Sequence, residues 1–283
     1  MFVLESLPEG ERKTGKELYD DCLTVRLKLQ KEIDVDYWPI SNKDQLLEKL
    51  TDIFNEAEKG YIPIIHFETH GSDGQKGEEL EFCFILSSGE KVPLSEIKEI
   101  LTNINISTGN KLFISVAACF GAAIFTLTLP TERSPFWAIM GPDNDIYPED
   151  IIAAFHEFYN KLIYNMDGNI ALKSANQLLL SKGIKLQFIT SEYLFKEAYK
   201  YFIKGIENQN IDNIINKLIR TKGNELVKKY GTKDAAIQQM YKKLTAEHEK
   251  EESFNKCRDY FFMFDLYPQK REELNLKYSD LKT

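Results

Sequence analysis

Two short apolar runs, each ending at a reactive side chain, constrain the fold of this chain more than any other feature. Residues 63–69 (PIIHFET) lead into His70-Gly71, and residues 111–118 (KLFISVAA) lead into Cys119. Both runs have the length of strands, and the second is apolar at nearly every position, as in a central parallel strand covered on both faces. In open parallel sheets, sites form at the carboxyl ends of the strands. We therefore expect His70 and Cys119 to reach one edge of the same sheet.

Strand and helix patterns alternate around these runs. We expect further strands at 2–4, 37–40 and 136–140, a hairpin within 81–92, and helices at 13–33, between 42 and 60, at 95–104, 148–165 and 171–180. This alternation predicts an α/β fold with a mainly parallel sheet flanked by helices. From residue 192 onward the periodicity is only helical. The sequence thus predicts two domains, at 1–189 and 190–283, the second an all-helical extension.

Composition narrows the functional classes. No apolar run approaches the length that crosses a membrane, and the N-terminus lacks the features of a signal peptide. The four cysteines are far apart and form no CxxC pair, which favours a reducing cytoplasm over a disulfide framework or a zinc site. The net charge of −8 disfavours direct nucleic-acid binding. The acidic excess lies in 1–189 and weakly favours basic partners.

A histidine and a cysteine at one sheet edge form a plausible nucleophilic pair. The thiolate is the reactive form of cysteine, so Cys119 needs an imidazole or another positive influence nearby. Small residues around it, such as Ala118 and Gly121, leave room for a substrate backbone.

With these residues in place, residues 1–180 resemble the caspase-like cysteine peptidases, and in particular the bacterial CHAT-domain branch. The matching features are His70-Gly71 after an apolar strand, the hairpin that follows, and Ala118-Cys119-Phe120-Gly121. Further matches lie at 94–97, 137–139, 158–162 and 171–175. His70 precedes Cys119 by 49 residues, near the spacing known for caspases.

The resemblance implies a cysteine endopeptidase that acts on a protein substrate and needs no cofactor. Cys119 would be the nucleophile, His70 the general acid and base, and the backbone N–H groups of Gly71 and Cys119 the oxyanion hole. Many bacterial relatives are released from inhibition by a partner or signal, often in defence against phage. The extension 190–283 would then be a regulatory or docking module for a protein partner.

Substrate selection is open at this stage. In related folds the pocket for the residue before the cut lies at the ends of neighbouring strands, which points to Glu5 and to the loop with Asp143 and Asp145. Either aspartate would favour a basic residue. Alternatively, both carboxylates cap the helix that starts at Pro148.

Other interpretations remain. His66 and Glu68 are expected to form a hydrogen-bonded polar pair near the site, although His66 and His70 share a strand face and a metal role is a minor alternative. The whole chain could be a catalytically silent caspase-like interaction module. A flavodoxin-like phosphate-binding protein is a weaker alternative, because the glycine-rich segment after His70 leads into a hairpin and not a helix.

Overall fold

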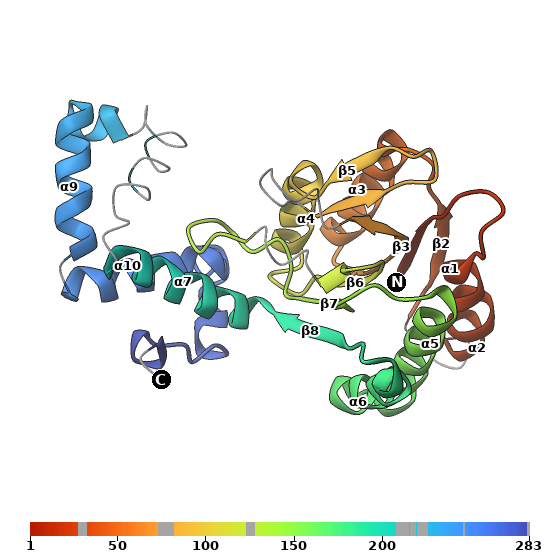
Figure 1. The fold of residues 1–283 in the computed structure, drawn as a ribbon. Coiled ribbons are helices and arrows are strands. Elements are labelled where there is room, and N and C mark those ends of the chain that lie inside the picture. Colours follow the sequence, from red (N-terminus) through yellow and green to blue (C-terminus); the bar gives the residue numbers. More distant parts are fainter. Residues whose placement is uncertain are drawn as a thin grey trace. The chain divides into compact units, whose positions relative to one another are not determined.

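The protein is described by a computed structural model that covers residues 1–27, 33–72, 82–122, 128–207, 215, 219, 226–245 and 247–281 (Figure 1). The chain forms two compact units. The first consists of Met1–Leu127 and Ser134–Ser191, and the second of Thr128–Arg133 and Glu192–Thr283. The short segment 128–133 thus belongs to the second unit, although the residues on both sides of it along the chain belong to the first.

The first unit contains a sheet whose strands are mostly parallel. Its strands are β1 (Phe2–Ser6), β2 (Asp36–Pro39), β3 (Ile64–Ser72), β6 (Phe113–Ala117), β7 (Ala138–Pro142) and β8 (Leu186–Thr190), in the order β2-β1-β3-β6-β7-β8. The first five of these in space run parallel, and β8 pairs antiparallel with β7. β4 (Cys83–Ile85) and β5 (Lys91–Pro93) form a hairpin that pairs with the end of β3. β3 and β6 are thus neighbours at the centre of the sheet.

Helices cover both faces of this sheet (Figure 1). On one face lie α3 (Lys43–Glu58) and α4 (Ser95–Ser107), which pack against each other. On the other lie α1 (Thr14–Glu17), the π-helical η1 (Leu18–Leu23), α2 (Thr24–Leu27), α5 (Pro148–Asn165), α6 (Gly168–Leu179) and the short η3 (Leu180–Lys182). Asn42 caps α3 by accepting from the backbone N–H of Gln45, and Pro148 begins α5. The predicted α/β fold is confirmed.

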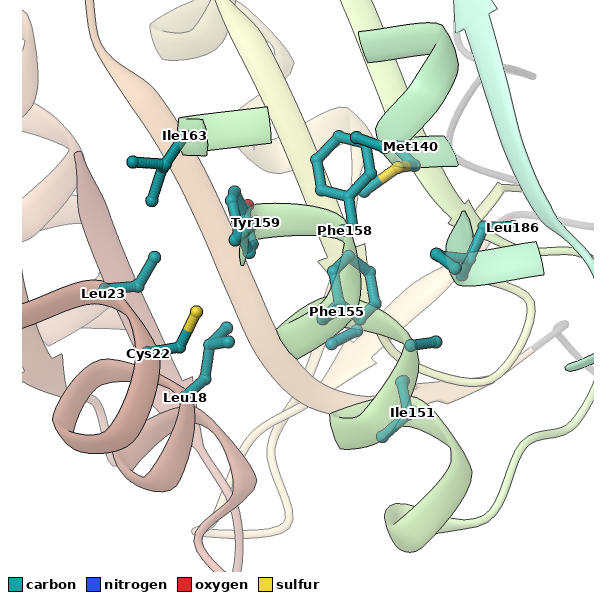
Figure 2. Packing of buried hydrophobic residues seen from close by; sticks show 14 of the residues in the cluster. Leu18, Cys22, Leu23, Met140, Ile151, Phe155, Phe158, Tyr159, Ile163 and Leu186 are labelled. Carbon is teal, nitrogen blue, oxygen red and sulfur yellow. The ribbon is translucent and has the colours of Figure 1, made fainter. Parts of the chain in front are cut away.

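Along each central strand, successive side chains point alternately to one helical layer and to the other. Leu18, Cys22, Phe155 and Tyr159 pack with the strand residues of one face in a buried cluster (Figure 2). His66 projects into the same layer, because its ring contacts the rings of Phe155 and Tyr159. Side chains therefore alternate along β3, and this face carries positions 66, 68 and, by continuation, 70.

Three differences from the expected elements have physical causes. β3 runs on to Ser72 because β4 pairs with its last three residues. β8 was not predicted, because it is a five-residue edge strand with partly exposed positions that leads at once into a helical pattern. The helix expected at 13–33 begins as the α-helix α1 and continues from Leu18 as the π-helical η1. Residues 28–32, most of the loop after Gly71 and most of 211–225 lie outside the described residues.

All regular elements among the described residues of the second unit are helices, as expected for the extension. It contains α7 (Ser191–Glu207), α9 (Lys233–Thr245), α10 (Glu247–Phe261) and the 3₁₀ turns η4 (Pro268–Glu272) and η5 (Tyr278–Leu281). Its own core is mainly aromatic: Phe195, Tyr199, Phe254, Phe261, Phe262, Phe264 and Leu276 are buried together. Arg133 joins this unit through a two-bonded ion pair with Asp265.

Candidate active site

The register of β3 and β6 brings His70 and Cys119 to the same edge of the sheet. The two strands pair in parallel up to Glu68 opposite Ala117. His70 lies two residues beyond Glu68, and Cys119 lies two residues beyond Ala117. Both side chains therefore lie at the carboxyl edge of adjacent central strands, where sites of open parallel sheets form.

Gly71 brings the two strand ends into close contact. A Cβ atom at position 71 would overlap with the backbone carbonyl oxygen of Cys119, and it would lie 2.9 Å from the ring of Phe82. Only glycine fits here, because neither backbone nor a buried ring can give way cheaply. The glycine after the histidine thus keeps the backbones of His70-Gly71 and Cys119 together.

A tight turn follows Cys119. Phe120 has a φ of 57°, a left-handed conformation that non-glycine residues rarely adopt, and the N–H of Gly121 donates to the carbonyl of Ala118. A Cβ at Gly121 would lie 2.6 Å from the carbonyl oxygen of Val116, and one at Gly141 would lie 2.6 Å from the backbone carbon of Gly121. The chain therefore changes direction directly after Cys119.

The thiol of Cys119 is half-buried and protonated in this arrangement. It donates to the carbonyl oxygen of Ile146, with the sulfur 3.9 Å from that oxygen. Burial is the main cause that raises the pKa of Cys119, and the carboxylate of Asp145 raises it further. Burial, with a further contribution from Asp145, therefore favours the protonated thiol of Cys119.

The imidazole of His70 contacts a different loop. Its Nε2 lies 2.7 Å from Oε2 of Glu11, in the segment between β1 and α1. About half of each side chain is exposed, 45% for His70 and 46% for Glu11. Within the described part of the chain, the side chains of His70 and Cys119 form no hydrogen bond with each other. Such bonds are often absent without substrate.

The remaining predicted site residues have distinct positions. The backbones of Gly71 and Cys119 are adjacent, and their role as an oxyanion hole stays a prediction. Asp143 accepts hydrogen bonds from the backbone N–H of Lys185 and the side chain of Gln187, so it anchors the start of β8. Asp145 is exposed and faces the thiol of Cys119.

Glu5 is buried against α1. It is 3% exposed, and its carboxylate accepts from the backbone N–H groups of Gly15 and Lys16 and from the hydroxyl of Tyr37. An acidic group at a helix N-terminus is stabilised by the helix dipole. The buried carboxylate of Glu5 thus stabilises α1 and is not accessible to solvent.

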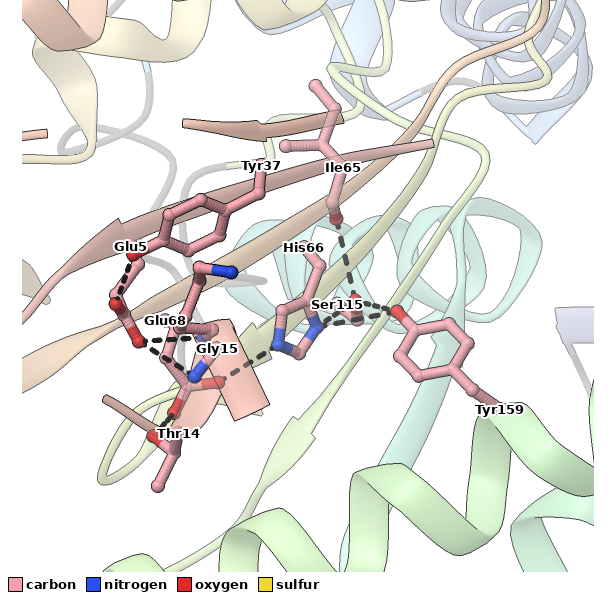
Figure 3. A network of polar contacts seen from close by, with 10 residues as sticks. Glu5, Thr14, Gly15, Tyr37, Ile65, His66, Glu68, Ser115 and Tyr159 are labelled. Carbon is pink, nitrogen blue, oxygen red and sulfur yellow. Dashed lines mark hydrogen bonds and ion pairs between the residues drawn. The ribbon is translucent and has the colours of Figure 1, made fainter. Parts of the chain in front are cut away.

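A buried polar network precedes the site along β3 and β6 (Figure 3). The expected pair is present, with Nε2 of His66 3.0 Å from Oε2 of Glu68. Nδ1 of His66 lies 2.9 Å from the hydroxyl of Ser115, which contacts the hydroxyl of Tyr159, and Thr14 donates to the other oxygen of Glu68. Burial raises the pKa of Tyr159, so its hydroxyl stays protonated. The network joins β3, β6, α1 and α5 just before the strands deliver His70 and Cys119.

Sequence reasoning missed Glu11, Ser115 and Tyr159. One signal for Glu11 was present, because it lies in the loop directly after the first strand, and loops at the carboxyl ends of parallel strands face the same edge. Ser115 and Tyr159 carry no comparable signal, since serine in a strand and tyrosine on an apolar helix face are ordinary core positions.

Comparison with solved structures identifies the fold. The crystal structure of the Drosophila initiator caspase Dronc matches 67% of this chain and 78% of its own, with a TM-score of 0.50 and 12% sequence identity. No protein-family model and no curated protein matches the chain. The first unit therefore has a caspase-like fold, which is the scaffold of a class of cysteine peptidases.

The described residues also bear on membrane spans and metal binding. No helix among them is long and apolar enough to cross a membrane. The same residues contain no group of three or more histidine, cysteine and acidic side chains arranged to hold a metal ion.

Proposed function

We propose that the chain is a cysteine endopeptidase in which Cys119 is the nucleophile and His70 the general acid and base. One observation carries this proposal: adjacent parallel strands of a caspase-like sheet deliver both side chains to one edge, with Gly71 packed on the backbone of Cys119. This arrangement brings a thiol, an imidazole and backbone N–H groups to one place.

The proposed reaction has two stages. The imidazole takes the proton of the thiol, the sulfur attacks the peptide carbonyl carbon, and the C–N bond breaks as the imidazolium gives that proton to the leaving amine. Water then attacks the thioester, His70 takes a proton from it, and the C–S bond breaks to release the acid and restore the thiol. The N–H groups of Gly71 and Cys119 would stabilise the oxyanion in each stage.

The resting position of the sulfur supports regulation. The thiol donates to Ile146, and its pKa is raised by burial and by Asp145. A rearrangement of the loop after β7 would free the sulfur to meet the imidazole. We infer that a partner or signal induces this change, with the helical second unit as the docking module, in a bacterial cytoplasmic defence pathway like that of the CHAT-domain proteins that the sequence resembles.

Asp145 supports a preference for basic residues in the substrate. It is exposed beside the nucleophile, whereas the carboxylate of Asp143 is already used at β8. A lysine or arginine before the cut would pair with Asp145 and also withdraw its charge from the sulfur. A protein with a basic cleavage site is therefore the proposed substrate, with no direct role for nucleic acid or membrane.

Cleavage of a diverse peptide library tests the proposal. The wild type is compared with Cys119→Ala and His70→Ala, and with Cys83→Ala as a control for another half-buried cysteine. General acid–base and nucleophilic roles predict a fall of at least about 100-fold for the first two variants. Cleavage that persists in Cys119→Ala refutes the assignment.

A catalytically silent interaction module is the second candidate. It is favoured by the raised pKa of Cys119 and by the separate loops that hold the two side chains. Alkylation by iodoacetamide distinguishes the two, because a catalytic thiol reacts much faster than structural ones. Equal and slow alkylation of Cys119 and Cys83, with candidate partner proteins present, supports the silent module.

A further inference from the structure

Glu11 is the only side chain that holds His70 among the residues that the structure describes. Its carboxylate oxygen Oε2 lies 2.7 Å from Nε2 of the imidazole. The two residues are 59 positions apart, so this contact is made by the fold and not by local sequence. No sequence pattern assigned a role to Glu11.

The loop that carries Glu11 is built to hold it in place. The ammonium group of Lys13 donates to the carbonyl oxygens of Leu7 and Pro8, and the N–H of Glu11 donates to that of Pro8. Beyond it, Arg12 forms two parallel hydrogen bonds with Glu17 at 2.9 and 2.7 Å, which ties the loop to the end of α1. These bonds restrict the loop on both sides of Glu11.

The contact determines which ring nitrogen is available for chemistry. An ionised carboxylate only accepts hydrogen bonds, so Nε2 must carry the proton that Glu11 receives. In the neutral ring, Nδ1 is then the basic nitrogen. Within the described chain Nδ1 makes no hydrogen bond, and it is left to take the thiol proton.

We propose that Glu11 is a positioning residue for His70, which fixes the Nε2–H tautomer and the orientation of the ring so that Nδ1 serves Cys119. This inference rests on the proposed peptidase function. It extends the pair to a Cys119–His70–Glu11 arrangement in which Glu11 acts only through His70. The analogous carboxylate in serine proteases shows how large such an effect can be.

Imidazole ¹⁵N NMR tests the inference without a substrate. The chain has four histidines, so the spectrum is tractable, and His70→Gln assigns the signal of His70. At about pH 8.5, where an ordinary imidazole is neutral, the wild type should show the Nε2–H tautomer at His70. Glu11→Ala should mix the two tautomers. Glu9→Gln, an exposed control in the same loop, should change nothing.

Kinetics with a cleaved peptide supply the second readout. Glu11→Ala should lower kcat by roughly 10- to 100-fold with KM unchanged, which is less than the loss in His70→Ala. Glu11→Gln should recover part of this loss, because its amide oxygen can still accept the Nε2–H bond. Glu9→Gln should behave as the wild type.

The outcomes separate this inference from the proposed function. A tautomer that Glu11→Ala leaves unchanged, or a kcat within twofold of the wild type, overturns the role of Glu11. If Cys119→Ala cleaves as the wild type does, the peptidase assignment fails. The NMR result then reports only that Glu11 orients His70.

Discussion

The charge of Asp145 adds to the effect of burial on the reactivity of Cys119. The carboxylate of Asp145 faces a half-buried sulfur, and both burial and this charge raise the pKa of the thiol. A raised pKa means less thiolate at neutral pH. Since alkylation follows the thiolate, the pH dependence of alkylation measures this effect directly.

Removal of that charge should make Cys119 more reactive. In Asp145→Asn we expect a lower thiol pKa, so the midpoint of the alkylation rate moves to lower pH and the rate at neutral pH rises. Peptide mapping by mass spectrometry resolves Cys119 from the other cysteines. Asp143→Asn is the matched control, because that carboxylate binds the backbone N–H of Lys185, just before β8. Equal midpoints in wild type and Asp145→Asn contradict the role of Asp145.

At the scale of single residues, some of the site was predictable and some was not. His70 and Cys119 each follow an apolar run of strand length, so the sequence alone predicts that both lie at one edge of the sheet. Glu11 lies in a loop whose shape depends on hydrogen bonds from the side chain of Lys13 to the carbonyl oxygens of Leu7 and Pro8. No periodicity reports such bonds, and Glu9 and Glu11 look alike in the sequence.

At the scale of elements, the buried network links the central strands β3 and β6 to the helices α1 and α5 that pack on them. Glu68 of β3 connects to His66, and through Thr14 to α1. His66 connects through Ser115 of β6 to Tyr159 of α5, and its Nδ1 also contacts the hydroxyl of Tyr159 directly. Both strands leave the network and reach the site within four residues. Packing in this layer and the position of the site are therefore coupled.

Loss of Glu68 should destabilise the first unit. Glu68→Ala leaves the buried Nε2 of His66 and the hydroxyl of Thr14 without their partner, and such groups cost about 1–3 kcal/mol each. We expect the free energy of unfolding to fall by about 2 kcal/mol or more in urea denaturation. The exposed Glu48→Ala on α3 should change it by less than about 0.5 kcal/mol. Similar values for the two variants speak against the network.

The elements themselves were largely predictable, because apolar periodicity reports buried faces. β6 is buried at all five positions and was recognised from its continuous apolar run. β8 was missed, since its burial alternates irregularly and its last residue abuts α7. The extra length of β3 depends on pairing with the hairpin, which places Ile85 opposite His70. The apolar pattern of residues 63–69 alone does not report this pairing.

At the scale of the whole molecule, each unit has its own core. The first contains the sheet and its two helical layers, and the second contains the aromatic cluster around Phe195 and Phe254. Separate cores of this kind allow local unfolding of one unit without the other. We therefore expect unfolding of the full chain to show two transitions, one for each unit.

Core truncations in the full chain test this independence. Phe195→Ala removes a buried ring of the second unit, which typically costs about 3–5 kcal/mol. Hydrogen exchange should then rise in peptides from 195–207 and 254–264, with β3 and β6 unchanged. Phe67→Ala, in the core of the first unit, should give the reverse pattern. Equal changes in both units for either variant would show a single cooperative core.

The place of Thr128–Arg133 has a consequence for synthesis of the chain. The ribosome releases this segment long before its partner Asp265, which is 132 positions later. The strands and helices up to Ser191 can assemble while Arg133 still lacks its ion pair and the ring of Tyr260. Gene fragments that stop near residue 191 would therefore carry an unsupported insert. A shortened protein needs either the complete second unit or a redesigned link between Ala122 and Ser134.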